Sequence, residues 1–169
     1  MNFIKIGHID ISEIKNRIKN LEDSVWLESQ IRQKTFDAHK ETETIEIMWD
    51  MDSLETNLQG QKSTYYHLLD INSFIDVLRP IYKDKYGNGD FIRILLVKLK
   101  KRNFIKPHID VGDSLTICHR THIPIITNDS VLFSVDTETK RLKEGEIWEI
   151  SNQKVHSVRN DSDFDRVHM

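Results

Sequence analysis

The stretch KPHIDVGDSLTICHRTHIPI, residues 106–125, places histidines, aspartates and an arginine among apolar, β-branched residues. Two of them, His108 and Asp110, are separated by one residue. In a β-strand, residues i and i+2 point to the same face, with Cα atoms about 7 Å apart. Both side chains can therefore reach one metal ion. The third ligand must come from another segment, and His156, in the strand-like sequence QKVHSV, is the candidate.

Two histidines and one carboxylate occupy one face of a metal ion and leave the opposite positions open. That ligand set is typical of non-haem Fe(II) oxygenases. Two other interpretations stay open on these residues alone. Zinc hydrolases also use two histidines and a carboxylate, although commonly as HExxH on a helix, which this sequence lacks. A lone histidine, moreover, is more often a satisfied core or surface residue than a ligand.

A second group of residues predicts a site for an anion. Arg120 and His122 are again two positions apart, one repeat of a strand face. Arg166 follows His156 by ten residues, beyond the turn sequence NDSD. A strand, a turn and a returning strand would bring Arg166 back beside the metal. The planar guanidinium of arginine can hold a carboxylate by two parallel hydrogen bonds.

The charges of this site indicate which anion it takes. Fe(II), Asp110 and Arg166 together carry two positive charges, with the histidines neutral. A dicarboxylate that chelates the metal at one end and reaches Arg166 at the other makes the total zero, and an unpaired buried charge costs several kcal/mol. 2-Oxoglutarate has this form. The alternative for Arg166 is a surface ion pair with Asp163 or Asp165.

The apolar pattern predicts the elements that carry these residues. Helical spacing predicts one helix over 14–25 with Ser12 as N-cap, and a second that begins at Asn72 and Ser73. Pro80 should kink or restart this second helix and YGNG at 86–89 should end it. The segment 51–70 reads as a polar loop. Alternation predicts strands at 43–49, 91–100, 105–110, 115–126, 131–136, 147–150, 154–159 and 164–168.

Many short strands with few helices are typical of a sandwich or barrel. Helices first and strands later predict an α+β, mainly β chain. With 169 residues, we expect one domain over 1–169, with a helical and strand region at 1–90 and a β core at 91–169.

Composition limits the possible partners and the compartment. The net charge of −3 gives no case for binding nucleic acid or an anionic membrane. No stretch approaches the length of a membrane span, and the N-terminus lacks the apolar core of a signal peptide. The lone cysteine, Cys118, excludes an internal disulfide. We therefore expect a cytoplasmic protein.

Several motifs taken together resemble the aspartyl/asparaginyl β-hydroxylase family of 2-oxoglutarate- and Fe(II)-dependent dioxygenases. They are HID, HRTHIPIITN, LKEGEIWEISNQKVHSVRN and DRVHM, in order over roughly residues 90–169. The upstream segments WLESQIRQKTFDAHKETETIEI and LRPIYKDKYGNGDFIRILLVKL resemble the family more weakly. The resemblance implies a double-stranded β-helix, or jelly roll, with the N-terminal helices packed on it and iron at its open mouth.

The resemblance also implies roles for individual residues. It assigns His108, Asp110 and His156 to the metal and Arg166 to the distal carboxylate of 2-oxoglutarate. His122 matches a position near the carboxylate at the metal end. In the EGEIW motif, Gly145 matches a structural turn.

Three further residues match positions around the substrate. Arg120 matches one near the carboxylates of substrate or cosubstrate. His39 and Thr42 resemble an upstream HxxT pattern near the substrate pocket. The metal-binding aspartate, retained here as Asp110, resembles the bacterial branch that includes free-amino-acid hydroxylases.

The expected reaction is hydroxylation of a C–H bond with Fe(II), 2-oxoglutarate and O2, releasing succinate and CO2. The expected substrate is an amino acid or an aspartyl/asparaginyl-type residue of a peptide or protein. The alternative is a metal-binding, cupin-like jelly roll without oxygenase activity, which would be an isomerase, a hydrolase or a binding protein.

Overall fold

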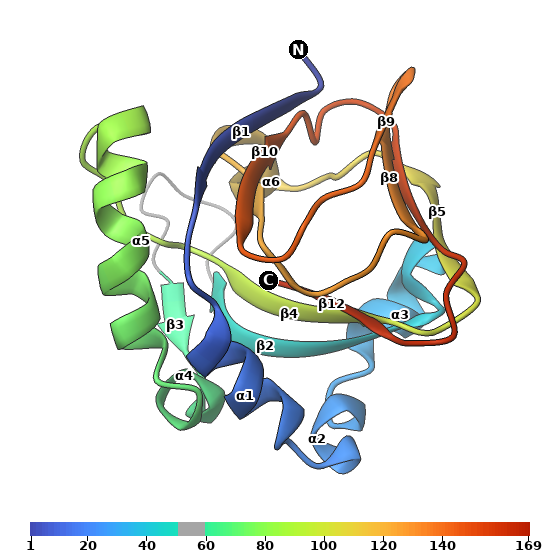
Figure 1. Ribbon diagram of the computed structural model, residues 1–169, viewed down its shortest axis with the longest axis horizontal. Coiled ribbons are helices and arrows are strands. Elements are labelled where there is room, and N and C mark those ends of the chain that lie inside the picture. Colours follow the sequence, from blue (N-terminus) through green and yellow to red (C-terminus); the bar gives the residue numbers. More distant parts are fainter. Residues whose placement is uncertain (51–59) are drawn as a thin grey trace.

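The structure is a computed structural model that describes residues 1–50 and 60–169. Strands predominate, with helices concentrated in the first half (Figure 1), which confirms the mainly β class with added helices. The strands are β1 (Phe3–His8), β2 (Thr42–Asp50), β3 (Gly60–Lys62), β4 (Ile94–Leu99), β5 (Asn103–His108), β6 (Thr121–His122), β7 (Pro124–Ile126), β8 (Val131–Val135), β9 (Glu138–Lys140), β10 (Glu146–Ile150), β11 (His156–Asn160) and β12 (Arg166–His168). The helices are α1 (Ser12–Lys19), α2 (Asp23–Leu27), α3 (Ile31–Thr35), the 3-10 helix η1 (Asp37–His39), α4 (Thr64–Leu68), α5 (Ile71–Tyr86) and α6 (Asp113–Ile117).

The described strands form three sheets whose neighbours come from distant parts of the chain. Their orders are β1-β10-β6, β5-β11-β8-β9 and β3-β2-β4-β12-β7. In Figure 1 the five-stranded sheet crosses the lower part of the view, and β10 and β8 rise on its two sides. Two pairings matter for the site. Strand β11 lies between β5 and β8, and β12 lies between β4 and β7.

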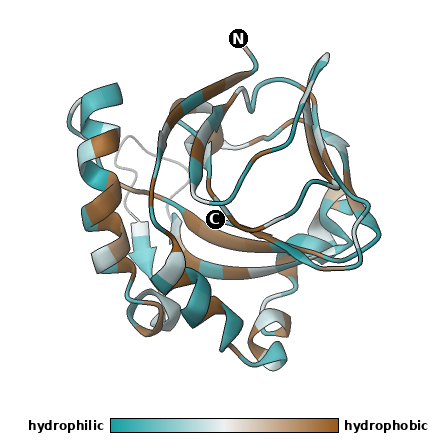
Figure 2. Cartoon of the chain, viewed as in Figure 1, coloured by the Kyte–Doolittle hydropathy of each residue, from teal (hydrophilic) through white to brown (hydrophobic). Residues whose placement is uncertain are grey.

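Two apolar clusters hold these layers together. The larger joins the helices to the five-stranded sheet and includes Ile14 and Ile18 of α1, Trp26 of α2 and Ile47 of β2. Helices α1, α2, α4 and α5 accordingly lie outside the sheets, and Figure 2 shows hydrophobic positions along β4 and on α5. The smaller cluster fills the space between the other sheets and includes Phe133 of β8. Burial of apolar area on this scale is the main stabilising term of the fold.

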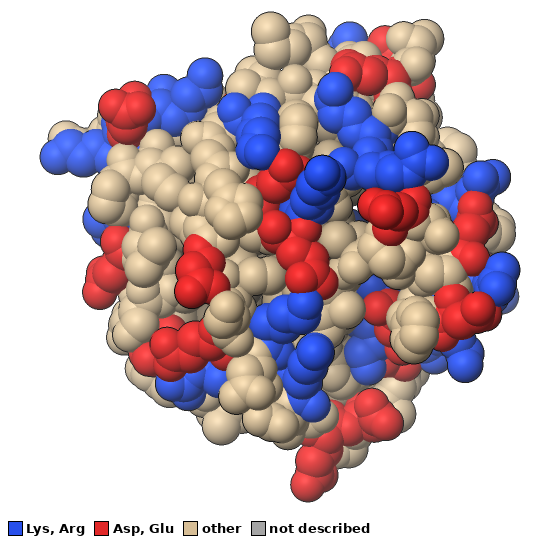
Figure 3. Space-filling model, viewed as in Figure 1, with Lys and Arg blue, Asp and Glu red and all other residues tan. Residues whose placement is uncertain are grey.

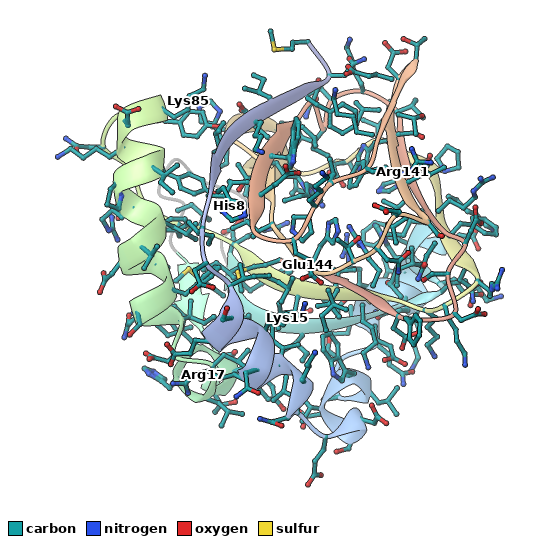
Figure 4. All side chains as sticks on the ribbon, in the orientation of Figure 1. His8, Lys15, Arg17, Lys85, Arg141 and Glu144 are labelled. Atoms are coloured by element: carbon teal, nitrogen blue, oxygen red, sulfur yellow. The ribbon has the colours of Figure 1, made fainter. Side chains whose placement is uncertain are left out.

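An ion pair fastens α1 to the turn before β10. Lys15 and Glu144 come from these two segments and lie side by side in Figure 4. Glu144 also accepts a hydrogen bond from the backbone N–H of Thr127, at 3.2 Å. At the next position Gly145 has φ +75°, and its carbonyl accepts a hydrogen bond from Ile9 at 2.9 Å. The EGE turn therefore has the structural role that we expected of it.

The predicted first helix is two shorter ones, and its predicted cap is wrong. Ser12 is the first residue of α1 rather than its N-cap. The N-cap position is Ile11, and the carboxylate of Asp10 before it accepts hydrogen bonds from the backbone N–H and the hydroxyl of Ser12, at 2.9 and 2.6 Å. The helix breaks after Lys19, and α2 begins at Asp23.

The second predicted helix also differs in detail. Helix α5 begins at Ile71 and continues through Pro80 to Tyr86. The predicted cap, Asn72, instead accepts a hydrogen bond from the hydroxyl of Tyr66, at 2.7 Å. Gly87, with φ +84°, follows the last helical residue, as the YGNG sequence predicted. Within the predicted loop 51–70, β3 and α4 are ordered elements, and residues 51–59 lie outside the described residues.

The predicted strand 115–126 is wrong over its first half. Gly112, with φ +120°, turns the chain into the single-turn helix α6, where Cys118 N–H bonds to the Ser114 carbonyl. Only β6 and β7 are strands there, so His122 lies in a strand and Arg120 precedes it.

The surface is mixed in charge. Figure 3 shows lysines and arginines interspersed with aspartates and glutamates over the visible face. Pairs such as Lys98 with Glu43, at 3.0 Å, connect neighbouring strands. Within the described residues, no helix is long and apolar enough to cross a membrane.

Candidate metal centre

His108, Asp110 and His156 converge at one end of the β5–β11 pair. His108 ends β5 and lies opposite His156, which begins β11. Asp110 follows β5 by two residues. One ligand atom from each residue lies within 4.8 Å of the others. The Nε2 atoms of His108 and His156 are 3.8 and 3.5 Å from oxygens of Asp110. This spacing leaves room for one ion between the three side chains.

Backbone carbonyls orient both imidazole rings. Nδ1 of His108 lies 2.8 Å from the carbonyl of Lys106, and Nδ1 of His156 lies 3.0 Å from that of Lys154. Because a carbonyl only accepts, each Nδ1 carries the proton and each Nε2 keeps a lone pair. Such outer hydrogen bonds fix the tautomer of metal-binding histidines. In His108 that Nε2 is buried and has no hydrogen-bond partner.

Burial keeps both rings neutral. It lowers the pKa of His108 and lowers that of His156 to about 4. Imidazole binds metals in its neutral form. The site offers two neutral imidazoles and the buried carboxylate of Asp110. This donor set suits Fe(II) and does not suit a metal ion that prefers oxygen ligands alone. The residues therefore fit the metal that the sequence predicted.

Arg120 forms an ion pair with Asp110 through Nη1. Its side chain is 20% exposed, and the residue lines the same cavity as the triad. Burial lowers the pKa of Arg120 to about 9. Arg120 was predicted to lie in a strand with His122. It instead precedes β6, and its side chain contacts the metal ligand Asp110 directly.

A cavity of about 1110 Å³ opens over the triad and contains the predicted anion site. Arg166, the first residue of β12, is 2% exposed and lines this cavity. Its Nε is buried without a hydrogen-bond partner, and no carboxylate of the described residues forms an ion pair with it. The predicted alternative, a surface pair with Asp163 or Asp165, is wrong, because Asp163 pairs with Arg102 instead and Asp165 accepts from the Lys101 backbone.

Two histidines lie beside this arginine. His122 has an unpartnered Nε2, and both ring nitrogens of His168 are buried and unpartnered. The rings of His122 and His168 are 6.2 Å apart, and both line the cavity. Burial lowers the pKa of each well below its ordinary value. His168 was not among the predicted residues, although it stands two positions after Arg166 and so shares its strand face.

The upstream HxxT residues take different positions. The buried ring of His39 lies 4.7 Å from that of His108, edge to face, and lines the cavity. The hydroxyl of Thr42 donates to the carbonyl of His39 at 2.7 Å. Thr42 does not appear among the described residues that line the cavity. It therefore supports the segment that carries His39.

A model of the family described as Aspartyl/Asparaginyl beta-hydroxylase matches residues 11–169. The chain belongs to this family. The aspartyl/asparaginyl beta-hydroxylases are dioxygenases, and the chain is accordingly an oxidoreductase that uses Fe(II), 2-oxoglutarate and O2. Family membership decides against the alternative of a metal-binding fold without oxygenase activity.

The fold of this chain is similar to that of a solved structure. The crystal structure of an oxidoreductase of the 2OG-Fe(II) oxygenase family, from Burkholderia pseudomallei, superposes with a TM-score of 0.58 at 14% identity. The likeness covers 98% of this chain and 90% of that chain. No curated protein matches the sequence.

Proposed function

We propose that residues 1–169 form one dioxygenase domain, with the N-terminal region 1–90 packed on a double-stranded β-helix core at 91–169. The larger apolar cluster supports the packing of the two regions, since it joins Ile14 and Ile18 of α1 to Ile125 of β7 and Ile147 of β10. A cytoplasmic location is part of the proposal, supported by the lone thiol of Cys118.

His108, Asp110 and His156 are the proposed ligands of Fe(II). The observation that carries this assignment is the convergence of three ligand atoms from β5, the segment after it and β11. Bound there, the metal supplies the oxidation of a C–H bond with O2. The chain supplies the positions of the reactants, and small misplacements of a reacting group cost large factors in rate.

Arg166 is the proposed partner of the distal carboxylate of 2-oxoglutarate, and His122 of the carboxylate at the metal end. The burial of Arg166 supports this role, because its charge has no anionic partner among the described residues. Burial lowers its pKa to about 9, so it stays charged at neutral pH. His122 is a neutral hydrogen-bonding group with a buried, unpartnered Nε2, and it lines the same cavity as Arg166 and His156.

The proposed substrate is an amino acid or an aspartyl/asparaginyl-type residue, hydroxylated with release of succinate and CO2. Arg120 is the proposed contact to a carboxylate of substrate or cosubstrate, supported by its position beside Asp110. His39, with Thr42 behind it, is the proposed wall of the substrate pocket, supported by the contact of His39 with His108.

Succinate release tests the proposed reaction. The iron-loaded enzyme is incubated with 2-oxoglutarate, O2 and a panel of amino acids and short peptides, and succinate is quantified with and without each candidate. We expect one candidate to raise succinate release and to gain one oxygen atom by mass spectrometry. Equal succinate release with every candidate, and no oxidised product, would contradict the proposed substrate class.

A further inference from the structure

Arg32 is a half-buried cation in the cavity, and the reaction proposed above has no use for it. It lies in α3 and lines the cavity together with the metal ligands. Its Nη2 lies 3.0 Å from Nε2 of His39, whose ring contacts His108. Its other terminal nitrogen, Nη1, is buried and has no hydrogen-bond partner. A buried donor without a partner costs about 1–3 kcal/mol, and more when the group is charged.

The charges in the cavity wall do not balance without another anion. Six charged residues that line the cavity, in the described part of the chain, are buried or half-buried. They are four arginines and two carboxylates: Arg32, Arg93, Arg120, Arg166, Glu46 and Asp110. One more buried carboxylate, Asp50, lies behind Arg93 at 3.9 Å. Fe(II) and doubly charged 2-oxoglutarate cancel one another. One positive charge remains.

The partners of the arginines show where that charge lies. Arg120 pairs with Asp110, Arg93 has Asp50, and the distal carboxylate of 2-oxoglutarate would pair with Arg166. Arg32 alone among these four then lacks a carboxylate within 4 Å in the described part of the chain. Glu46 attracts Arg32 only through space, and its carboxylate accepts a hydrogen bond from Ser29 at 3.3 Å.

We propose that Arg32 forms a second anion subsite, which binds a carboxylate of the substrate and so selects substrates with a net negative charge at the end that enters the cavity. This inference rests on the proposed function, because it takes Arg166 as the site of 2-oxoglutarate. Arg32 contacts His39, and His39 contacts His108, so a carboxylate held by the guanidinium of Arg32 lies one side-chain layer from the metal ligands. The guanidinium, whose Nη1 has no hydrogen-bond partner, supplies a charge-assisted hydrogen bond, which is stronger than a neutral one.

Two apolar side chains that line the cavity favour the binding of an anion at Arg32. Ile31 and Phe36 flank Arg32 in sequence, line the cavity, and are 72% and 49% exposed. They add nonpolar surface to the cavity that Arg32 lines, and nonpolar surface near a charge lowers the local dielectric and strengthens its attraction for an anion. A neutral carboxamide of the same shape gains little from such a charge.

Acetate and acetamide are matched probes of this subsite. The protein is labelled with 15N-arginine, and both probes are titrated into the complex with Zn(II) and 2-oxoglutarate, in which the metal and Arg166 are occupied. We expect a saturable shift of the Arg32 side-chain resonances with acetate and none with acetamide. Calorimetry measures acetate binding to the variants, which have no Arg32 resonance, and we expect Arg32→Gln to weaken it at least about tenfold and Arg32→Lys to restore part of it.

Arg79→Gln is the matched control, because Arg79 lines the same cavity but its side chain is 51% exposed and pairs with Asp90. It should leave acetate binding unchanged. Equal response to both probes, or acetate binding that survives Arg32→Gln, would overturn the subsite. The affinity for 2-oxoglutarate is measured in the same samples, and a loss with Arg32→Gln equal to that with Arg166→Gln would assign Arg32 to the cosubstrate instead.

A second titration separates this inference from the proposed function. Acetate is also added to the metal-free protein, where the Arg32 resonances report on the subsite directly. Failure to bind Zn(II) or 2-oxoglutarate would contradict the proposed function alone. Absence of an Arg32 shift in both titrations, with the metal and 2-oxoglutarate bound in the first, would contradict the subsite alone.

Discussion

His156 lies directly opposite His108 in the antiparallel pairing of β11 with β5, and their ring centroids are 4.3 Å apart. The two residues are far apart in sequence, so the hydrogen-bond register of one strand pair fixes the distance between them. A shift of that register by one residue would turn one ring to the opposite face of the sheet. The metal centre therefore depends on the pairing of the four-stranded sheet.

Metal binding should stabilise the fold through these histidines. With Zn(II) at a free concentration one hundred times its Kd, we expect the free energy of unfolding to rise by about 2.7 kcal/mol. His156→Ala should abolish this gain. His67→Ala, which removes an exposed histidine of α4, should retain it. Chemical denaturation with and without metal measures both variants, and an undiminished gain in His156→Ala would contradict the ligand assignment.

Arg166→Gln should weaken the binding of 2-oxoglutarate by about 2–5 kcal/mol, the usual cost of removing one partner of a buried charge pair. The affinity for Zn(II) should stay nearly unchanged, because Arg166 is not a predicted ligand. Calorimetry on the zinc-loaded protein measures both. Arg159→Gln is the control, since Arg159 is exposed on β11 and pairs with Asp161. Unchanged 2-oxoglutarate affinity in Arg166→Gln would show that another residue holds the distal carboxylate.

The metal-free protein should lose stability below neutral pH because of His168. Burial lowers the pKa of His168 well below its ordinary value, so the folded state keeps this ring neutral. The unfolded chain binds a proton there as the pH falls through about 6.5. Protonation therefore favours unfolding, and between pH 7.5 and pH 5.0 this residue alone should lower the free energy of unfolding by about 2 kcal/mol.

His168→Gln should reduce that pH-dependent loss by the same amount. The comparison uses denaturation midpoints of the metal-free protein at both pH values. The exposed residue His67 provides the control, and His67→Gln should leave the difference between the two pH values unchanged. A wild-type protein equally stable at both pH values would contradict the burial of a neutral His168.

Gly145→Ala should destabilise the fold by about 1–3 kcal/mol from backbone strain alone, because Gly145 has φ +75°. A clash adds to this cost, since the new Cβ would lie 2.5 Å from the carbonyl oxygen of Ile9. Gly89→Ala is the matched control, as a Cβ there meets no atom within 4 Å. Thermal unfolding of the two variants should differ clearly, and equal midpoints would contradict the close approach of the turn before β10 to the backbone of Ile9.

The sequence predicted most strands of the second half and the residues of the metal centre. Alternating apolar residues report which side of a strand is buried, and the spacing of His108 and Asp110 is a local property. Which strands pair is not local. The contact of His156 with His108 was an expectation from residue chemistry and the family resemblance, and only the register of β11 with β5 gives its geometry.

The sequence did not predict α6 or the position of Arg32. Residues 113–117 have strand-like composition, but a positive φ at Gly112 starts a helical turn there. Helix α3 has five residues, too few to show a hydrophobic period. Arg32 and His39 are in contact because the chain turns between α3 and η1. The spacing of these residues in the sequence does not predict that turn. His168 could have been predicted, because it lies two residues after Arg166 and so shares its strand face.

Anaerobic absorption spectroscopy tests the central claim most directly. The metal-free protein is mixed with Fe(II) and then with 2-oxoglutarate in the absence of O2, and iron binding is measured separately. We predict a weak visible charge-transfer band of the keto acid chelated to iron in the wild type, and no band in His156→Ala. A wild-type protein that holds iron and 2-oxoglutarate but shows no such band would contradict the account.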